Sequence, residues 1–322
     1  MKNYLSILCA IIVMASMASC SAPNNESSRK EIVSTNSDVS DEASDNENVS
    51  DSNSQQESSD TDKEQQEDKP TEKENDELSI EEQVLWEIND VTLTATKIED
   101  DSIWGTGIKV LAENNSDKDV SIYCDAVIVN DYMISDLTSI QVTAGNKVND
   151  TINLLSSELE AAGIDKIGKI EIYMHMSDAE TYETLETSDC ITIKTSLFDE
   201  IDTEADTSGT VLLEQDGVKI IGKYVDEDSF WGAAALLYIE NNTDKNIIVQ
   251  TDNVAVNGFM ITSLCSQDVY AGKKAFTTVD FFSSSLEENN ITSVDTVEMD
   301  FKVLDEDYNH IIEADKISFN AK

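Results

Sequence analysis

The motif ENNSDK at residues 113–118 returns as ENNTDK at residues 240–245, 127 positions later. The same offset aligns VIVN at residues 127–130 with VAVN at residues 254–257. Over residues 84–178, 33 of 95 positions are identical in the two copies. The chain therefore contains a duplicated unit of about 115 residues, long enough for one domain with its own core.

Each copy has the alternation of apolar and polar residues that is typical of half-buried β-strands. It is clearest in KIEIYMHM at residues 169–176 and in VEMDFKV at residues 297–303. In the strand that follows ENNSDK, the apolar positions change from even to odd numbers. A one-residue bulge near Asp125 would return these side chains to one face, and we predict one there.

Turn signals separate the predicted strands. Hairpin turns are predicted at Asn89-Asp90, Asn130-Asp131, Asp216-Gly217 and Asn257-Gly258. Residues 156–162 and 283–289 each predict one short helical turn, ended by Gly163 and Asn290. We therefore predict an all-β protein with two tandem antiparallel immunoglobulin-like β-sandwiches, at residues 81–196 and 210–322, joined by a linker at residues 197–209.

The shared motifs also carry a resemblance to a family. They read ENN[ST]DK, V-x-V-N-[GD]-[YF]-M-I, V-x-A-G and S-x-L-E-x-x-x-I in order. This pattern resembles a group of exported domains of unknown function in gut Firmicutes. More distantly, it is similar to immunoprotective-extracellular proteins, which are immunoglobulin-like sandwiches. The resemblance covers residues 84–195 and 211–322, implies fold and export, and implies no catalytic residues.

The N-terminus has the features of an export signal followed by a lipid-attachment site. The apolar run at residues 5–17 is too short to span a bilayer. It ends in Ala18-Ser19-Cys20, which resembles the lipobox of bacterial lipoproteins, where the cysteine receives a diacylglycerol. We predict a signal peptide at residues 1–19, with Cys20 anchored to the outer face of the cytoplasmic membrane. An ordinary signal peptide cut near Ala18 is the alternative.

Charge predicts a tether and limits the partners. Residues 21–80 hold 18 acidic and five basic side chains and no aromatic residue. Such a segment cannot bury enough apolar surface to fold, so residues 20–80 are predicted to be a disordered acidic stalk. The whole chain has a net charge of −45, which excludes general binding to nucleic acid. The expected partners are the membrane, through the anchor, and a protein or cell-wall component.

One acidic triplet precedes the Trp-Gly pair in each copy. These residues are weak calcium candidates: Glu99, Asp100, Asp101, Asp226, Glu227 and Asp228. Solvated loops are the preferred interpretation, because three adjacent side chains cannot all point inward. Trp104 and Trp231 follow the triplets and are predicted to close the core rather than to bind a glycan or peptide.

Cysteine and histidine give little sign of catalysis. Cys124, Cys190 and Cys265 have no cysteine at the matching position of the other copy, so buried free thiols are predicted. A bridge between Cys124 and Cys190 is the alternative. His175 and His310 are also unmatched, without a shared acid partner. We expect a non-catalytic surface lipoprotein without a cofactor; the alternatives are an extracellular hydrolase with a carboxylate pair and a structural spacer.

Overall fold

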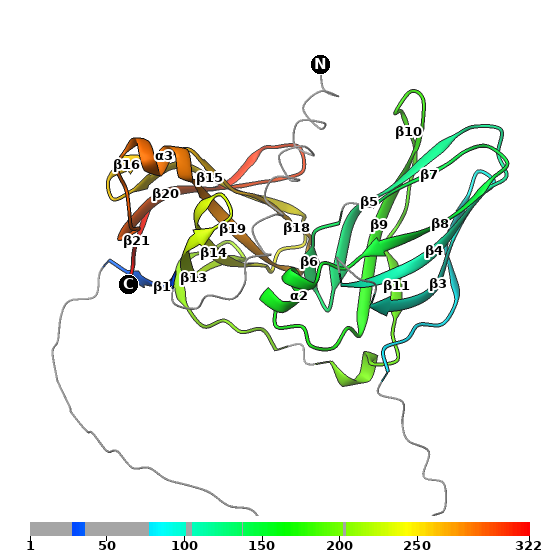
Figure 1. The fold of residues 1–322 in the computed structure, drawn as a ribbon, viewed down its shortest axis with the longest axis horizontal. Helices are drawn as coiled ribbons and strands as arrows, with labels where there is room; N and C mark the ends of the chain where they lie inside the picture. Colours follow the sequence, from blue (N-terminus) through cyan, green and yellow to red (C-terminus); the bar gives the residue numbers. More distant parts are fainter. Residues whose placement is uncertain (1–27, 36–76, 101–104, 137, 202–203) are drawn as a thin grey trace, which may run out of the picture. The chain divides into compact units, whose positions relative to one another are not determined.

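The computed structural model describes residues 28–35, 77–100, 105–136, 138–201 and 204–322. The predicted signal peptide, Cys20, Asp101 and Trp104 lie outside these residues. The described chain is mostly β, with strands in two sheets whose pairings are mostly antiparallel (Figure 1). No helix in these ranges has the length and apolar character needed to cross a membrane.

The first copy contains ten strands, a short α-helix and a 3-10 turn in its described part. They are β2 (Gln83–Ile88), β3 (Val91–Asp100), β4 (Thr106–Asn114), β5 (Val120–Val129), β6 (Tyr132–Ile134), β7 (Ser139–Val142), β8 (Lys147–Asn153), α2 (Ser156–Ala161), β9 (Lys169–Asp178), β10 (Thr184–Thr187), β11 (Ile191–Lys194) and η3 (Phe198–Glu200). One sheet has the order β2-β3-β4-β8. In the other group β5 pairs with β6, β7 and β9, and β9 pairs with β10 and β11.

The second copy repeats this arrangement. Its elements are β12 (Thr210–Gln215), β13 (Val218–Ser229), β14 (Gly232–Asn241), β15 (Ile247–Val256), β16 (Phe259–Met260), β17 (Ser263–Leu264), β18 (Ser266–Val269), β19 (Lys274–Phe282), α3 (Ser283–Glu288), β20 (Thr296–Leu304) and β21 (His310–Ala321). Strands β12, β13, β14 and β19 pair in this order, as β2, β3, β4 and β8 do. Strand β15 pairs with β18 and β20, and β20 pairs with β21.

Each copy has a hydrophobic core of its own. The first includes Ile108 from β4 and Ile172 from β9, and the second includes Leu237 from β14 and Phe301 from β20. Each pair comes from the two different strand groups of its copy, so both groups face one core. The alternation predicted for residues 169–176 is confirmed, because Ile170, Ile172, Met174 and Met176 are all buried.

The predicted hairpin turns are confirmed. Asn89, Asn130, Asp216 and Asn257 all have positive φ, between 48° and 52°. This left-handed conformation suits the two-residue turns that match the twist of paired strands, and Asn, Asp and Gly adopt it most readily. The sequence could therefore place these turns because their chemistry is local.

The predicted bulge and helical turns are confirmed as well. The pairing of β5 with β9 shifts between Cys124 and Ala126, so the extra residue is Asp125. Helices α2 and α3 occupy the predicted stretches, and Gly163 and Asn290 follow them with positive φ of 67° and 55°. A left-handed residue directly after a helix ends it.

The two copies also touch each other. The Lys273 Nζ atom of the second copy lies 2.8 Å from Asp131 Oδ1 and 2.5 Å from Glu171 Oε2 of the first. Burial alone would raise the pKa of Asp131, but hydrogen bonds from Lys169 and Lys273 hold it below its usual value. Beside this ion pair, the ring of Tyr132 stacks on that of Phe276, with 6.0 Å between centroids. The copies are therefore joined by side-chain contacts as well as by the chain.

The repeated ENN[ST]DK motif builds a buried asparagine turn. Asn114 is fully buried, and its Nδ2 donates to the carbonyl oxygens of Lys118 and Val142. Its Oδ1 accepts from the backbone N–H of Ser116. Asn241 makes the same contacts in the second copy, with Lys245, Val269 and Thr243. One amide side chain thus satisfies three backbone groups where the chain leaves the sheet.

We predict that Asn241→Ala lowers the free energy of unfolding by roughly 3 kcal/mol, because it leaves buried backbone groups without partners. The matched control is Asn242→Ala at the neighbouring exposed position, where a change of at most about 0.5 kcal/mol is expected. Urea denaturation of both variants measures the difference. Equal stability of the two variants would contradict a structural role for this asparagine.

Candidate functional site: a strand-acceptor groove

Six residues from the predicted stalk form strand β1 (Arg29–Ser34), which completes the second copy. Its first half pairs with β13, where Lys30 lies opposite Val225. Its second half pairs with β21, where Ile32 lies opposite Ala321. Strand β1 therefore crosses from one strand group to the other, beside the C-terminus (Figure 1). We call the space between β13 and β21 that holds it the acceptor groove.

The first copy fills the same place with the residues just before it. Ile80 forms a bridge with Thr195, which occupies the position of Ala321 in the second copy. The offset at this point is 126, as in the match of Asp189 with Asp315. Ile80 in the first copy thus corresponds to Ile32 in the second.

The backbone hydrogen bonds beside these two isoleucines are the same in both copies. The N–H of Ser196 donates to the carbonyl oxygen of Ser79 over 2.8 Å. In the second copy the N–H of Lys322 donates to the carbonyl oxygen of Glu31 over 2.9 Å. Residues 31–32 therefore do for the second copy what residues 79–80 do for the first.

The residues directly before the second copy do not supply this strand. Residues 204–208 read EADTS, and the one apolar residue among them, Ala205, packs against the core of the first copy. The side chain of Asp206 and the carbonyl oxygen of Ser208 instead accept hydrogen bonds from Lys223 Nζ. The groove therefore takes its strand from a distant part of the chain.

Ile32 is the apolar anchor of β1. It is 1% exposed and lies in the core of the second copy. A Cβ atom at Gly222, on the floor of the groove, would lie 2.9 Å from the Cγ2 atom of Ile32. Glycine at this position makes room for the isoleucine. Burying such a side chain contributes about 1.5–3 kcal/mol.

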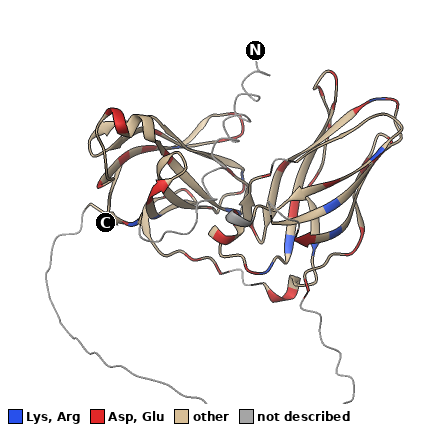
Figure 2. Cartoon of the chain, in the orientation of Figure 1, with Lys and Arg blue, Asp and Glu red and all other residues tan. Residues whose placement is uncertain are grey.

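Basic residues of β1 meet the acidic triplet of the second copy. The Lys30 Nζ atom lies 3.1 Å from Glu227 Oε1 and 3.0 Å from the carbonyl oxygen of Val294. Glu227 also accepts the N–H of Val294 over 2.6 Å. The guanidinium of Arg29 lies 4.6 Å from the centroid of the Tyr224 ring. Figure 2 shows these basic residues as the blue segment beside the C-terminus.

Four of the six calcium candidates, Glu99, Asp100, Asp226 and Glu227, have protein partners. Asp226 accepts hydrogen bonds from the Ser28 hydroxyl and from the N–H of Asp228. In the first copy, Glu99 pairs with Lys97, and Asp100 accepts the Thr106 hydroxyl over 2.6 Å. Among the described residues, no three His, Cys, Asp or Glu side chains are grouped to hold a metal ion. The preferred interpretation of the triplets as solvated loops stays a prediction, with calcium binding as the alternative.

The structure differs here from the predicted stalk. Residues 20–80 were expected to have no structure, yet Arg29–Ser34 forms a strand. The composition of the whole segment hides this strand, because most of its neighbours are acidic or serine. A local signal exists: Ile32-Val33 is the one adjacent pair of β-branched apolar residues in the segment, and Arg29 is the only arginine of the chain.

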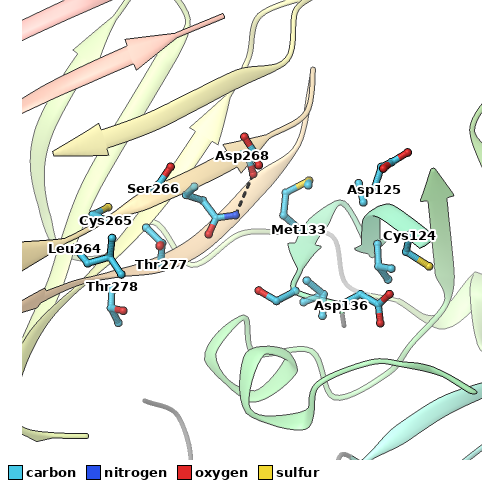
Figure 3. Close-up of a pocket in the computed structure, with 15 residues that line it drawn as sticks. Cys124, Asp125, Met133, Asp136, Leu264, Cys265, Ser266, Asp268, Thr277 and Thr278 are labelled. Atoms are coloured by element: carbon cyan, nitrogen blue, oxygen red, sulfur yellow. Dashed lines mark hydrogen bonds between the residues drawn. The ribbon is translucent and has the colours of Figure 1, made fainter. Parts of the chain in front are cut away.

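A cavity of about 180 Å³ lies between the two copies (Figure 3). Cys124, Asp125 and Asp136 line it from the first copy, and Cys265 and Asp268 line it from the second. All three cysteines of the described chain are free thiols, so the alternative bridge between Cys124 and Cys190 does not form. Cys265 is buried as predicted, whereas Cys190 is exposed.

The thiols of this cavity are held protonated. Burial raises the pKa of Cys265 to about 12. Burial, together with the nearby Asp136 and Asp125, raises the pKa of Cys124 well above its usual value. Because the thiolate is the nucleophile, neither sulfur is activated for covalent chemistry.

The unmatched histidine His175 does have a shared acid partner. Its Nδ1 atom lies 2.5 Å from Oδ1 of the bulge residue Asp125. In the second copy, Lys302 Nζ lies 2.5 Å from Asp252 Oδ2 at the matching positions. The same contact therefore occurs between β5 and β9 in the first copy and between β15 and β20 in the second, with a histidine in one and a lysine in the other.

Trp231 takes a half-buried position rather than the predicted core position. Its ring lies edge-on to Phe230 and Phe282, with centroid distances of 4.9 Å and 6.0 Å. Phe230 itself is 62% exposed. This aromatic cluster lies at the turn between β13 and β14.

Asp280 of β19 is a fully buried carboxyl group. Neither of its oxygens has a hydrogen-bond partner within the described part of the chain. Burial raises its pKa to about 6. The matching residue of the first copy is Asn153, which carries no charge.

No family model matches the chain, and no curated protein matches it. A solved structure of the Salmonella enterica SafA pilin in complex with the SafB chaperone aligns with 71% of this chain and 96% of its own, at 14% identity and a TM-score of 0.22. A protein of unknown function from Porphyromonas gingivalis W83 aligns with 75% of this chain and 98% of its own, at 10% identity and a TM-score of 0.17. The described part of the chain is predominantly β. Scores this low say nothing about its activity or partners.

We predict that Ile32→Asp removes β1 from the acceptor groove, because it places a charge in the apolar core. The second copy should lose roughly 3–5 kcal/mol of stability. Hydrogen exchange measured by mass spectrometry should become at least about 100-fold faster in β13 and β21, since 1.4 kcal/mol is tenfold. Strands β3 and β4 should be unaffected. Ser34→Asp at the exposed end of β1 is the control, and equal protection in both variants would contradict this role of Ile32.

Asp280 predicts a fall in stability between pH 4 and pH 7. In the unfolded chain this carboxyl ionises near pH 3.9, whereas in the folded protein its pKa is about 6. The folded state therefore holds the proton more tightly, and stability falls as pH rises through this window. Between pH 4 and pH 7, the native chain should lose about 3 kcal/mol of unfolding free energy relative to Asp280→Asn, which has the residue of the first copy.

Urea denaturation of both proteins from pH 4 to pH 8 measures this difference. Asp252→Asn is the control, because Lys302 lowers the pKa of Asp252 and that stabilisation is lost only as pH falls below about 4, so its stability difference should stay nearly constant over this range. A stability difference between the native chain and Asp280→Asn that does not change with pH would contradict an ionisable buried Asp280.

Proposed function

We propose that the chain is an exported, non-catalytic lipoprotein that presents two immunoglobulin-like sandwiches at the bacterial cell surface. A diacylglycerol on Cys20 anchors it to the outer face of the cytoplasmic membrane. The two copies bind a protein or a cell-wall component. Loops at the ends of such sandwiches are the usual place for recognition.

The observation that carries this proposal is that the residues shared by both copies make structural contacts. Asn114 and Asn241 close the same turn, and Asn130 and Asn257 accept backbone N–H groups at the same corner. Asp125 and Asp252 make matching cross-strand pairs. Duplication has thus kept a scaffold. This favours a binding module over a hydrolase. A hydrolase would need a set of catalytic side chains, either in both copies or in one.

The described chemistry points the same way. The cavity thiols are protonated, and the carboxyl group of Asp280 is enclosed without a partner among the described residues. A glycoside hydrolase of the usual kind needs two carboxyl groups facing one substrate. Within the described residues, no specific observation favours that alternative.

Strand β1 changes what the acidic segment does in this proposal. Eight residues separate Cys20 from Arg29, since 29 − 20 − 1 = 8. Such a connection spans at most about 30 Å when fully extended. The second copy, not the first, would then lie next to the membrane. The residues between β1 and Glu77 would connect the two copies instead of raising both from the surface.

The anchor is tested by replacing its cysteine. Cys20→Ala should move the protein from the membrane fraction to the medium, because the thiol that receives the lipid is gone. Cys9→Ala, within the predicted signal peptide, is the control and should stay with the membrane. Fractionation and labelling with a palmitate analogue measure the outcome. Membrane retention of Cys20→Ala, with no label on the native protein, would contradict the proposal.

A further inference from the structure

We propose that the acceptor groove is a site of strand exchange, and that its second occupant is β1 of another copy of this chain. Two molecules would each place residues 29–34 between β13 and β21 of the other. The same contacts would form between molecules that the structure shows within one molecule. This proposal does not depend on the lipid anchor.

The main contacts described for β1 come from the strand itself. They are the backbone pairing with β13 and β21, the burial of Ile32 over Gly222, and the approach of Lys30 to Glu227. None of them involves the residues that link β1 to the first copy. A β1 strand from another molecule therefore brings every group that the groove recognises, and main-chain pairing with an apolar anchor is a general mode of strand addition.

A comparison with the first copy shows why β1 can be exchanged between molecules, whereas the segment at Ile80 cannot. Ile80 reaches Thr195 and is separated from β2 by only two residues, 81 and 82, so it is part of the same compact unit. Ile32, by contrast, is followed by 42 residues between Ser34 and Glu77, since 77 − 34 − 1 = 42. A connection of this length gives the chain's own strand a local concentration on the order of millimolar. A second copy competes when its own concentration approaches this value or when the resident strand is displaced.

Charge makes the exchange specific. Two chains with a net charge of −45 repel each other, and salt reduces this repulsion. Strand β1 opens with Arg29 and Lys30, and the wall of the groove carries Asp226 and Glu227. The segment that must cross between molecules is thus basic where its acceptor is acidic.

A pair of complementary variants of the full chain tests the proposal. Ile32→Asp disables the donor strand but leaves an open groove. Gly222→Leu closes the groove, because its Cβ alone would lie 2.9 Å from Ile32, and leaves a free β1. Each variant should be monomeric alone. Their mixture, at physiological salt, should form a heterodimer with twice the monomer mass by light scattering.

The mixture should also regain structure. Slow hydrogen exchange in β21 of the Ile32→Asp chain should return when the Gly222→Leu chain is added, which a non-specific association would not produce. Ile32→Asp mixed with a chain that carries both substitutions is the control and should stay monomeric.

A second design avoids variants whose second copy is destabilised. One chain carries Val33→Cys and another carries Asn320→Cys, which are opposite each other in the pairing of β1 with β21. After joint unfolding and refolding at high concentration, a disulfide between the two introduced cysteines, identified by mass spectrometry, should link the two chains. Glu313→Cys, farther along β21, replaces Asn320→Cys as the control and should not link.

The proposal is overturned if neither the variant mixture nor the cysteine pair joins two chains. It is also overturned if the Ile32→Asp chain binds a free peptide of residues 28–35 but not the Gly222→Leu chain. In that case the groove accepts a strand, but a second copy is not its occupant.

Discussion

The second copy depends on one isoleucine that lies outside it in the sequence. A β-sheet core leaves apolar surface and unpaired backbone groups wherever a strand is missing, and both are unfavourable in water. In this protein the gap between β13 and β21 is closed by β1, with Ile32 buried over Gly222. The pairing of both sheet edges and the neutralisation of Glu227 by Lys30 follow from that one placement.

The two copies solve the same problem with different parts of the chain. In the first, Ile80 belongs to the residues that lead into β2. In the second, the corresponding residues carry Asp206 and Ser208, which bind Lys223 instead. Duplication therefore preserved the scaffold but not its first strand, and the chain supplies that strand from a distance. This gives an acidic segment, which composition alone would describe as a spacer, a defined structural end.

The acidic residues of the two copies also differ in whether their ion-pair partners are local or distant in the sequence. The acidic triplet of the first copy is balanced by Lys97 on its own strand, whereas that of the second is balanced by Lys30 from β1. Equivalent positions thus acquire different partners. In contrast, the Asp125 and Asp252 contacts stay equivalent although one partner is a histidine and the other a lysine, because both partners come from the same position on the neighbouring strand.

The sequence by itself determined what rests on short-range chemistry. The hairpin turns at Asn89 and Asn257, the bulge at Asp125 and the helical turns before Gly163 and Asn290 all depend on a few neighbouring residues, so local patterns were sufficient to place them. Only the tertiary structure decided where β1 binds, that Lys273 reaches Asp131, and that Asp280 is buried without a partner among the described residues. These contacts join residues far apart in the chain, and a strand's partner is set by the edge left open in three dimensions, which no local pattern encodes.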